Sequence, residues 1–223
     1  MSTGTKHTVT AFDDDMDEIR GMIAEMGARA ETAVTNAMKA LLENDKELAG
    51  TTRTEDKIID GLETEVEKLV VRTIALRAPM ADDLRELIAA LKMSAVIERI
   101  GDYAKNIAKR VGLLEDSKFL GSNNQLRKMG DITVEMIRMA MDAYAKRDID
   151  LAKAVTVRDD DVDQLYKDLF VDFVAFVAKH PTSATEVAHL LFISKNLERI
   201  GDHSTTVAEM IYFTETGENL PDA

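Results

Sequence analysis

The chain repeats itself at a spacing of about one hundred residues, and this duplication constrains its fold more than any other feature. The segment "MGARAETAVTNAMKALLENDKELA", which begins at Met26, aligns with "MGDITVEMIRMAMDAYAKRDIDLA", which begins at Met129, at an offset of 103 residues. The five residues "ERIGD" occur at 98–102 and again at 198–202, at an offset of 100. A unit used twice in tandem predicts two similar halves related by internal symmetry.

Each half has the pattern of three long helices. Only three prolines occur, at 79, 181 and 221, and apolar residues recur at spacings of three and four between them. The predicted helices span residues 8–44, 45–78, 81–112, 123–147, 148–179 and 183–214. We therefore predict an all-α fold of two tandem, pseudo-symmetric three-helix bundles with six long antiparallel helices. The first repeat covers 1–115 and the second 122–217, with a break in the Gly, Ser and Asn cluster of "GLLEDSKFLGSNNQ".

Helical periodicity separates the acids of the two ERIGD copies from the apolar residues around them. At about 100° per residue, Glu98 and Asp102 fall on the side of the third helix opposite its apolar stripe. Glu198 and Asp202 fall in the same way on the sixth helix, where Glu209 shares their face. We therefore expect these carboxylates to face outward.

A second set of acids lies on the helices that precede the ERIGD helices. Asp56 and Asp60 match Asp159 and Asp163 at the offset of 103. For the helix that carries Asp56, we assign the buried stripe to Ile58, Leu62, Val66, Leu69, Thr73 and Leu76. This assignment predicts that Asp56 and Asp60 face outward, whereas Asp163 lies at the edge of an apolar face.

The helix-to-helix turns bring these acids to matching heights. Asp60 and Glu98 are each 19 residues from Pro79, and Asp56 and Asp102 are each 23 residues from it. Two antiparallel helices that meet at a turn place residues equally distant from the turn side by side. The same rule applied around Pro181 brings together Asp159, Asp163, Glu198 and Asp202. Each half is thus predicted to carry four carboxylates in a groove between two helices.

Four carboxylates at close range repel one another unless a cation compensates them. Hard cations take oxygen ligands, and acids one helical turn apart can reach a common ion. We therefore predict divalent or trivalent metal binding, by iron, magnesium, manganese, calcium or zinc. The candidate ligands are Glu98, Asp102, Glu198, Asp202, Asp56, Asp60, Asp159, Asp163 and Glu209. Gly101 and Gly201 either let helices or an ion approach closely or make a packing contact.

Two other interpretations of the acids remain open. A di-iron carboxylate oxidase on a helical bundle would place Glu-x-x-His pairs inside the bundle, and the duplicated positions carry no such pair. A metal-free helical adaptor would use the acids only as a solvated or partner-binding face. We expect a protein that is not an enzyme.

Composition excludes several classes of function. Twenty-eight basic and 41 acidic residues give a net charge of −13, which disfavours binding to nucleic acid. The absence of cysteine excludes disulfides and thiol catalysis and fits a reducing cytoplasm. The N-terminal residues lack the apolar segment of a signal peptide, and the most apolar window, 169–178, is half the length needed to cross a bilayer. Any membrane association is therefore expected to run through a partner.

The sequence resembles the PhoU family of regulators of bacterial phosphate uptake. The resemblance is carried by "HTVTAFDDDMDEIRGMIAEMG", "IERIGDYAKNIAKR" and "NLERIGDHSTTVAEMI", which together sample nearly the whole chain. The second motif departs from the family pattern, because Ser204 and Thr206 stand where alanine and asparagine are usual, whereas the first motif keeps Asn106. Lys109 in the first motif is also replaced by Glu209 in the second, so the two sites need not match in affinity or ion number.

This resemblance implies a function in regulation rather than catalysis. Similar proteins bind metal clusters through their E/D-x-x-x-D motifs, which correspond here to Glu98, Asp102, Glu198 and Asp202. They are thought to couple the ATPase subunit of a phosphate ABC transporter to a sensor histidine kinase and to keep the phosphate-starvation response off when phosphate is plentiful. The resemblance further implies a cytoplasmic homodimer that reaches the membrane only through its partners.

Overall fold

The computed structural model describes residues 4–114 and 117–221, and the elements within these ranges are all helical. The long helices are α1 (Gly4–Glu43), α2 (Lys46–Arg77), α3 (Asp82–Val111), α5 (Gln125–Lys146), α6 (Ile149–Lys179) and α7 (Ala184–Thr216). Two short elements complete the set, α4 (Lys118–Ser122) and the 3₁₀ turn η1 (Pro181–Ser183). The predicted all-α fold of two tandem three-helix bundles is confirmed.

The same capping chemistry starts the second helix of each bundle. The Asp45 carboxylate accepts hydrogen bonds from the backbone N–H groups of Glu47 and Leu48, at 3.0 and 2.9 Å. Asp148, its counterpart at the offset of 103, caps α6 through two bonds of 3.0 Å. These bonds satisfy backbone donors that have no partner inside a helix, which explains why the two aspartates recur at these positions.

We expect Asp148→Ala to lower the free energy of unfolding by about 1 kcal/mol, because two N–H groups lose their acceptor. Urea unfolding followed by circular dichroism measures this change. The matched control is Asp150→Ala, which removes a carboxylate two residues further on that only forms a 3.7 Å surface ion pair with Lys153. Equal losses for the two variants would contradict the capping role.

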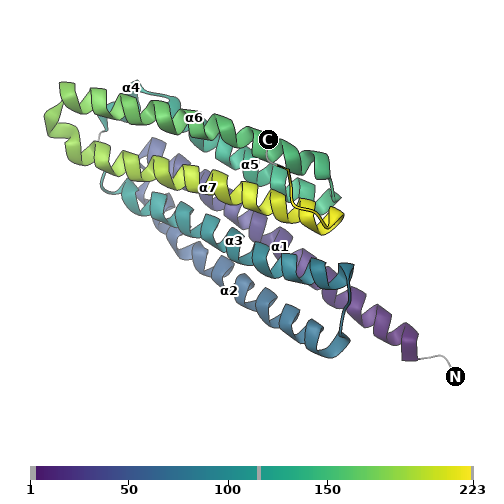
Figure 1. Cartoon of the computed structure of the whole chain (residues 1–223). Coiled ribbons are helices and arrows are strands. Elements are labelled where there is room, and N and C mark those ends of the chain that lie inside the picture. The colour runs from purple at the N-terminus through teal and green to yellow at the C-terminus, as the bar shows by residue number, and fades with distance from the viewer. Residues whose placement is uncertain (1–3, 115–116, 222–223) are drawn as a thin grey trace.

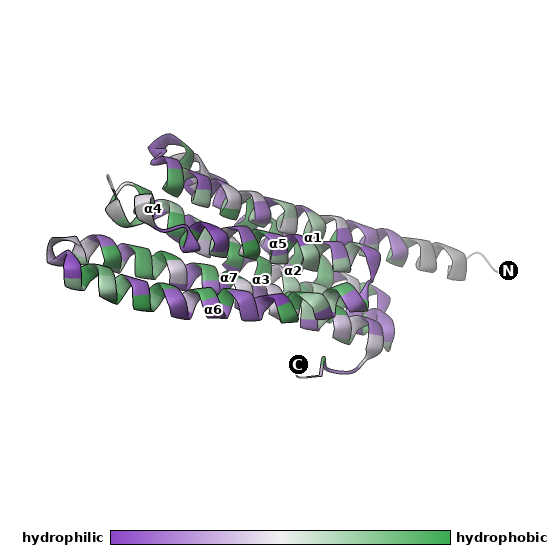
Figure 2. Ribbon diagram, turned by 90° about the horizontal axis from the view of Figure 1, so that it is seen from above, coloured by the Kyte–Doolittle hydropathy of each residue, from purple (hydrophilic) through white to green (hydrophobic). Residues whose placement is uncertain are grey.

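The six long helices form two layers (Figure 1). Helices α2, α3, α7 and α6 lie side by side in that order, while α1 and α5 lie behind them. The two bundles therefore meet through two contacts, α3 with α7 and α1 with α5. Figure 2, seen from above, shows hydrophobic and hydrophilic residues alternating along the helices, as amphipathic helices require. The core is shared by the two repeats.

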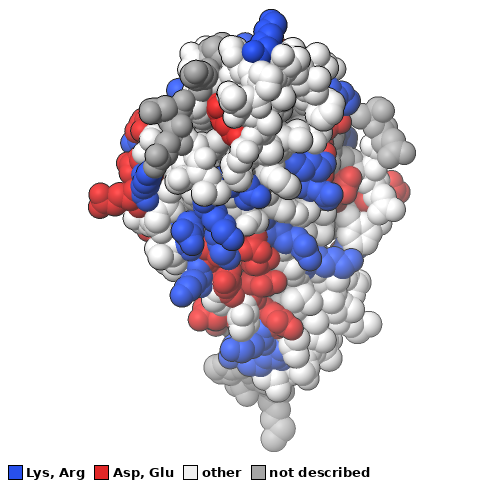
Figure 3. Space-filling model, turned by 90° about the vertical axis from the view of Figure 1, so that its left-hand side faces the viewer, with Lys and Arg blue, Asp and Glu red and all other residues white. Residues whose placement is uncertain are grey.

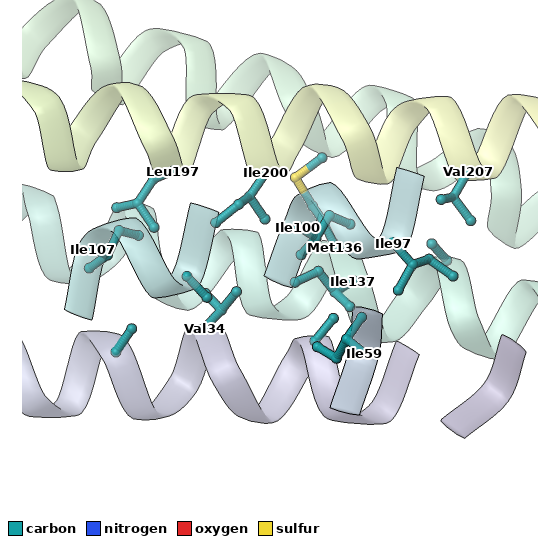
Figure 4. Packing of buried hydrophobic residues seen from close by; sticks show 14 of the residues in the cluster. Val34, Ile59, Ile97, Ile100, Ile107, Met136, Ile137, Leu197, Ile200 and Val207 are labelled. Atoms are coloured by element: carbon teal, nitrogen blue, oxygen red, sulfur yellow. The ribbon is translucent and has the colours of Figure 1, made fainter. Parts of the chain in front are cut away.

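Aliphatic side chains from both layers fill the space between the bundles (Figure 4). The central residues of this core are Val34, Ile59, Ile97, Ile100, Ile107, Met136, Ile137, Leu197, Ile200 and Val207. All of them are buried. The expected apolar stripes of the third and sixth long helices are buried, since Ile97 and Ile100 on α3 and Leu197 and Ile200 on α7 belong to this set.

Methionine and glycine make reciprocal contacts where α1 meets α5. A Cβ atom on Gly27 would overlap with Met141, and a Cβ atom on Gly130 would lie 2.8 Å from the Cε of Met38. Gly27 corresponds to Gly130, and Met38 to Met141, at the offset of 103. Each half therefore presents the same glycine to the same methionine of the other half, which is the arrangement of a pseudo-two-fold axis.

The connector between the bundles contains the short helix α4, which the sequence analysis did not predict. Phe119 on α4 is buried, and its ring lies 4.7 Å from that of Phe173 and 5.3 Å from that of Phe176. Ser117 starts the helix and donates a hydrogen bond of 2.6 Å to Glu186. These tertiary contacts with the second bundle explain why the segment folds despite its Gly and Ser content. Within the described residues, none of the helices is both long enough and apolar enough to span a membrane.

Candidate functional site

The candidate site residues lie at the contacts between α2 and α3 and between α6 and α7. We call Asp56, Asp60, Glu98 and Asp102 the first acidic cluster, and Asp159, Asp163, Glu198 and Asp202 the second. In both clusters, two acids one turn apart on one helix stand beside two acids one turn apart on the next. Helix α2 packs directly against α3, and α6 packs directly against α7 (Figure 1).

A lysine holds part of the first cluster together. Lys105 Nζ donates to Asp56 Oδ2 at 2.5 Å and to Asp102 Oδ1 at 2.9 Å. One ammonium group thus contacts an acid on α2 and an acid on α3, which places these two acids at the same height. The predicted pairing of Asp56 with Asp102 is confirmed. The hydrogen bonds to Asp56 and Asp102 raise the pKa of Lys105 above its ordinary value, so this lysine stays charged.

The prediction that Asp56 faces outward is wrong. Its side chain is only 4% exposed and lies on the buried face of α2. The observed buried positions of α2 are Ala49, Thr52, Asp56, Ile59, Val66, Leu69, Val70 and Thr73. Ile58 and Leu76, which were assigned to the core, are 42% and 68% exposed. The physical reason is Lys105, since a charge can be buried when it is paired and hydrogen-bonded.

Among the acids of the first cluster, Glu98 has the most strongly raised pKa. Burial raises the pKa of Glu98 to about 7, with further contributions from the negative charges of Asp102, Glu63 and Asp60. The sequence analysis missed Glu63, which lies one turn after Asp60 on α2. Its spacing of three from Asp60 was the available signal, but its counterpart in the second repeat is Tyr166, so the duplication did not mark it.

In the second cluster the positive charge sits elsewhere. Lys195 donates a hydrogen bond to Glu198, and its Nζ lies 5.3 Å from the centre of the Tyr166 ring. The position equivalent to Lys105 is Thr205. Burial raises the pKa of Asp159 to about 6, and the charges of Asp202 and Asp163 add to this shift. A hydrogen bond from Thr205 offsets part of this shift. Burial also raises the pKa of Asp56, although Lys105 opposes this shift. The two ends therefore differ in that Lys105 supplies a positive charge at Asp56, whereas Thr205 supplies an uncharged hydroxyl group at Asp159.

The glycine repeated in the two ERIGD copies has a steric cause. A Cβ atom on Gly201 would lie 2.6 Å from Asp159 Oδ1. A Cβ atom on Gly101 would lie 2.9 Å from Ile59 Cδ1 and 3.5 Å from Asp56 Oδ1. Both glycines thus let the preceding helix and its aspartate approach closely, so close approach and packing are the same contact here.

The remaining candidate ligands lie nearer the surface. Asp60 is exposed. Asp163 forms an ion pair on its own helix, with its Oδ2 atom 3.7 Å from Lys167 Nζ. Glu209 lies apart from both clusters, in a hollow of about 250 Å³ at the seam between α3 and α7 that also contains Lys92. The structure therefore brings Asp56 and Asp102 together and places Glu209 elsewhere.

The aromatic and basic residues of the two motifs meet at the seam between the repeats. Tyr103 on α3 and His203 on α7 are equivalent positions, and their rings pack edge to face at 5.3 Å. Burial lowers the pKa of His203, and the positive charges of Arg99 and Arg199 lower it further. Arg199 Nε also lies 4.0 Å from Glu198 Oε2. These contacts make His203 a seam residue rather than part of an acidic cluster.

The two clusters differ in how well they suit a metal ion. In the part of the chain that the structure describes, no three Asp, Glu, His or Cys side chains converge on one ion position. An ammonium group already occupies the Asp56 end of the first cluster, while Asp159 and Asp202 face each other without a lysine at the equivalent position and offer the carboxylate oxygens that a hard cation prefers. Figure 3, which views the left-hand end of Figure 1, likewise shows Asp and Glu side chains gathered beside Lys and Arg side chains.

The fold and the duplicated acidic clusters define a class of all-helical proteins built from two tandem three-helix repeats. A family model described as PhoU domain matches residues 23–111 and 126–211, one match in each repeat. The chain belongs to the PhoU family.

Relatives and solved structures agree with this assignment over nearly the whole chain. A phosphate-specific transport system accessory protein PhoU homolog from Zymomonas mobilis is 47% identical, and the match covers 97% of this chain and 91% of the relative. One from Caulobacter vibrioides is 38% identical, with 97% and 94% covered. The crystal structure of PhoU from Pseudomonas aeruginosa has a TM-score of 0.88 at 32% identity and covers 93% of this chain and 100% of that one. The phosphate transport system regulatory protein PhoU from Streptococcus pneumoniae has a TM-score of 0.87 at 27% identity, with 94% and 99% covered.

Proposed function

We propose that this chain is an accessory regulatory protein of a phosphate-specific transport system. The observation that carries this proposal is the similarity to PhoU relatives, because it extends over 97% of the chain at 47% identity and includes both repeats. In this role the chain binds the ATPase subunit of the transporter and a sensor histidine kinase. It acts as a negative regulator in the cytoplasm and forms a homodimer.

A reporter driven by a phosphate-starvation promoter tests this function. Deletion of the gene in its source cells should raise reporter expression in phosphate-rich medium, and expression of this chain should restore the low level. An empty vector is the control. A pull-down from the same cells should recover the transporter ATPase and the kinase. A folded chain that restores nothing and recovers neither partner would count against the proposal.

We also propose that the second acidic cluster binds a hard metal ion as part of this function. The support is the Asp159 carboxylate, because burial together with the negative charges of Asp202 and Asp163 raises its pKa to about 6. Asp159 and Asp202 would hold the ion through carboxylate oxygens, and Glu198 lies in the same cluster. A bound cation would supply positive charge between α6 and α7 and relieve the repulsion of their acids.

Asp159→Asn together with Asp202→Asn should reduce the metal content of the purified chain severalfold, because both changes remove anionic oxygen ligands. Elemental analysis after dialysis measures the metal. The matched control is Asp131→Asn with Asp160→Asn, which removes two exposed carboxylates outside the clusters. Circular dichroism should show an unchanged fold in both variants. Equal metal content in the two double variants would contradict binding at the second cluster.

A further inference from the structure

We infer that Lys105 is the resident cation of the first acidic cluster, so that metal binding between the facing aspartates is confined to the second repeat. The two halves of this duplicated chain would then differ in kind, since one is held by an internal ammonium group and the other by an ion from solution. This inference rests on the proposed metal binding of the second cluster.

The contacts of Lys105 are those expected of a bridging cation. Its Nζ lies 2.5 Å from Asp56 Oδ2 on α2 and 2.9 Å from Asp102 Oδ1 on α3. The Asp56 side chain is 4% exposed, while that of Lys105 is 40% exposed. The lysine therefore reaches from the surface down to a buried carboxylate, and it joins two helices as a metal ion bound to both acids would.

An ammonium group and a metal ion exclude each other at this pair of acids. Two positive charges in contact with the same carboxylates repel each other strongly in a partly buried site. A metal ion could bind only after Lys105 had left, and its departure would break two charge-assisted hydrogen bonds.

The second repeat has no lysine at the position from which Lys105 bridges the facing aspartates. Thr205 stands at the position of Lys105, and its uncharged hydroxyl group offers Asp159 a hydrogen bond in place of a positive charge. Lys195 contacts Glu198 instead, and the position equivalent to Lys195 in the first repeat is Ala95. Glu198 Oε2 is buried and accepts no hydrogen bond from the residues that the structure describes. The facing pair Asp159 and Asp202 thus has no lysine at the position from which Lys105 bridges Asp56 and Asp102.

Because of this difference, the two repeats depend on metal ions to different extents. The contact between α2 and α3 carries its own cation and is independent of the ion supply. The contact between α6 and α7 depends on a cation that can bind and leave. Changes in metal availability should therefore act on the second bundle, while the first bundle serves as a fixed support.

Exchanging the two residues tests this inference. Lys105→Thr copies the second repeat into the first, and Thr205→Lys copies the first into the second. Equilibrium dialysis against Mn²⁺ followed by elemental analysis gives the ions bound per chain. We expect Lys105→Thr to bind about one more Mn²⁺ than the wild type and Thr205→Lys to bind about one fewer. The control is Lys109→Thr, one turn further along α3, which removes the same charge from an exposed lysine and should match the wild type.

The outcomes separate this inference from the proposed function. If the wild type binds Mn²⁺ and Lys105→Thr binds no more, the inference is overturned while metal binding stands. If the wild type binds none but Lys105→Thr gains an ion, the role of Lys105 as the cation of the first cluster stands, and metal binding by the second cluster fails. If neither binds Mn²⁺, both fail. Should Lys105→Thr not fold, Thr205→Lys decides, since wild-type Mn²⁺ content in that variant would overturn the inference.

Discussion

We expect Gly27→Val to lower the melting temperature by about 4 to 8 °C, which corresponds to about 2 kcal/mol for a chain of this size. A Cβ atom at this position already overlaps with the Met141 side chain, and valine adds two further methyl groups. The contact joins α1 to α5 and thus one repeat to the other. Thermal unfolding followed by circular dichroism at 222 nm measures the change.

The matched control is Gly21→Val, which lies less than two turns earlier on the same helix. A Cβ atom there would meet no atom within 4 Å. Replacing glycine by another residue inside a helix is favourable by itself, by up to about 1 kcal/mol. The control variant should therefore be as stable as the wild type or slightly more stable. If both variants unfold at the same temperature, the close approach of α1 and α5 does not contribute to stability.

The fold was predictable because its signals are local and occur twice. The offset of 103 identified the repeat, and the same offset relates the capping residues Asp45 and Asp148. Proline and left-handed residues end the helices where the periodicity stops, as at Ala78, whose φ is 48°. The helix α4 was not predictable from such signals, since it depends on Phe119 packing against Phe173 in the second bundle.

The side-by-side placement of the acids was predictable from the sequence, but the burial of Asp56 was not. Counting residues from Pro79 placed Asp56 beside Asp102, and both contact Lys105. The same periodicity put Asp56 on the solvent side, because a pattern of apolar residues treats every carboxylate as exposed. Only the position of the Lys105 side chain shows that this carboxylate is buried and paired. Glu63 was missed for a related reason, as a residue present in one repeat leaves no trace in a comparison of the two.

We expect the metal-free wild type to be less stable near pH 7.5 than a variant with Glu98→Gln and Asp159→Asn. The pKa of Glu98 is raised to about 7 and that of Asp159 to about 6 in the folded chain. The folded state therefore binds these protons more tightly than the unfolded state does. It follows that the contribution of these groups to stability falls as the pH rises from about 4 to about 7.

The amide side chains of the variant mimic the protonated acids at every pH. A shift of two pKa units corresponds to about 3 kcal/mol for a fully buried group, but solvent screens these side chains, so we expect about 1 kcal/mol from each. In the presence of a chelator, the variant should exceed the wild type by about 2 kcal/mol at pH 7.5 and by almost nothing at pH 4. Urea unfolding at a series of pH values measures the difference.

The control pair Asp131→Asn and Asp160→Asn carries the same change in net charge on exposed positions. Its stability should follow the wild type across the same range of pH, which separates local repulsion in the clusters from the effect of a net charge of −13. A Glu98→Gln and Asp159→Asn variant that is less stable than the wild type at pH 7.5 would mean that both carboxylates make favourable contacts without metal. The acidic clusters would then have no repulsion for a cation to relieve, and the argument for metal binding from their electrostatics would fail.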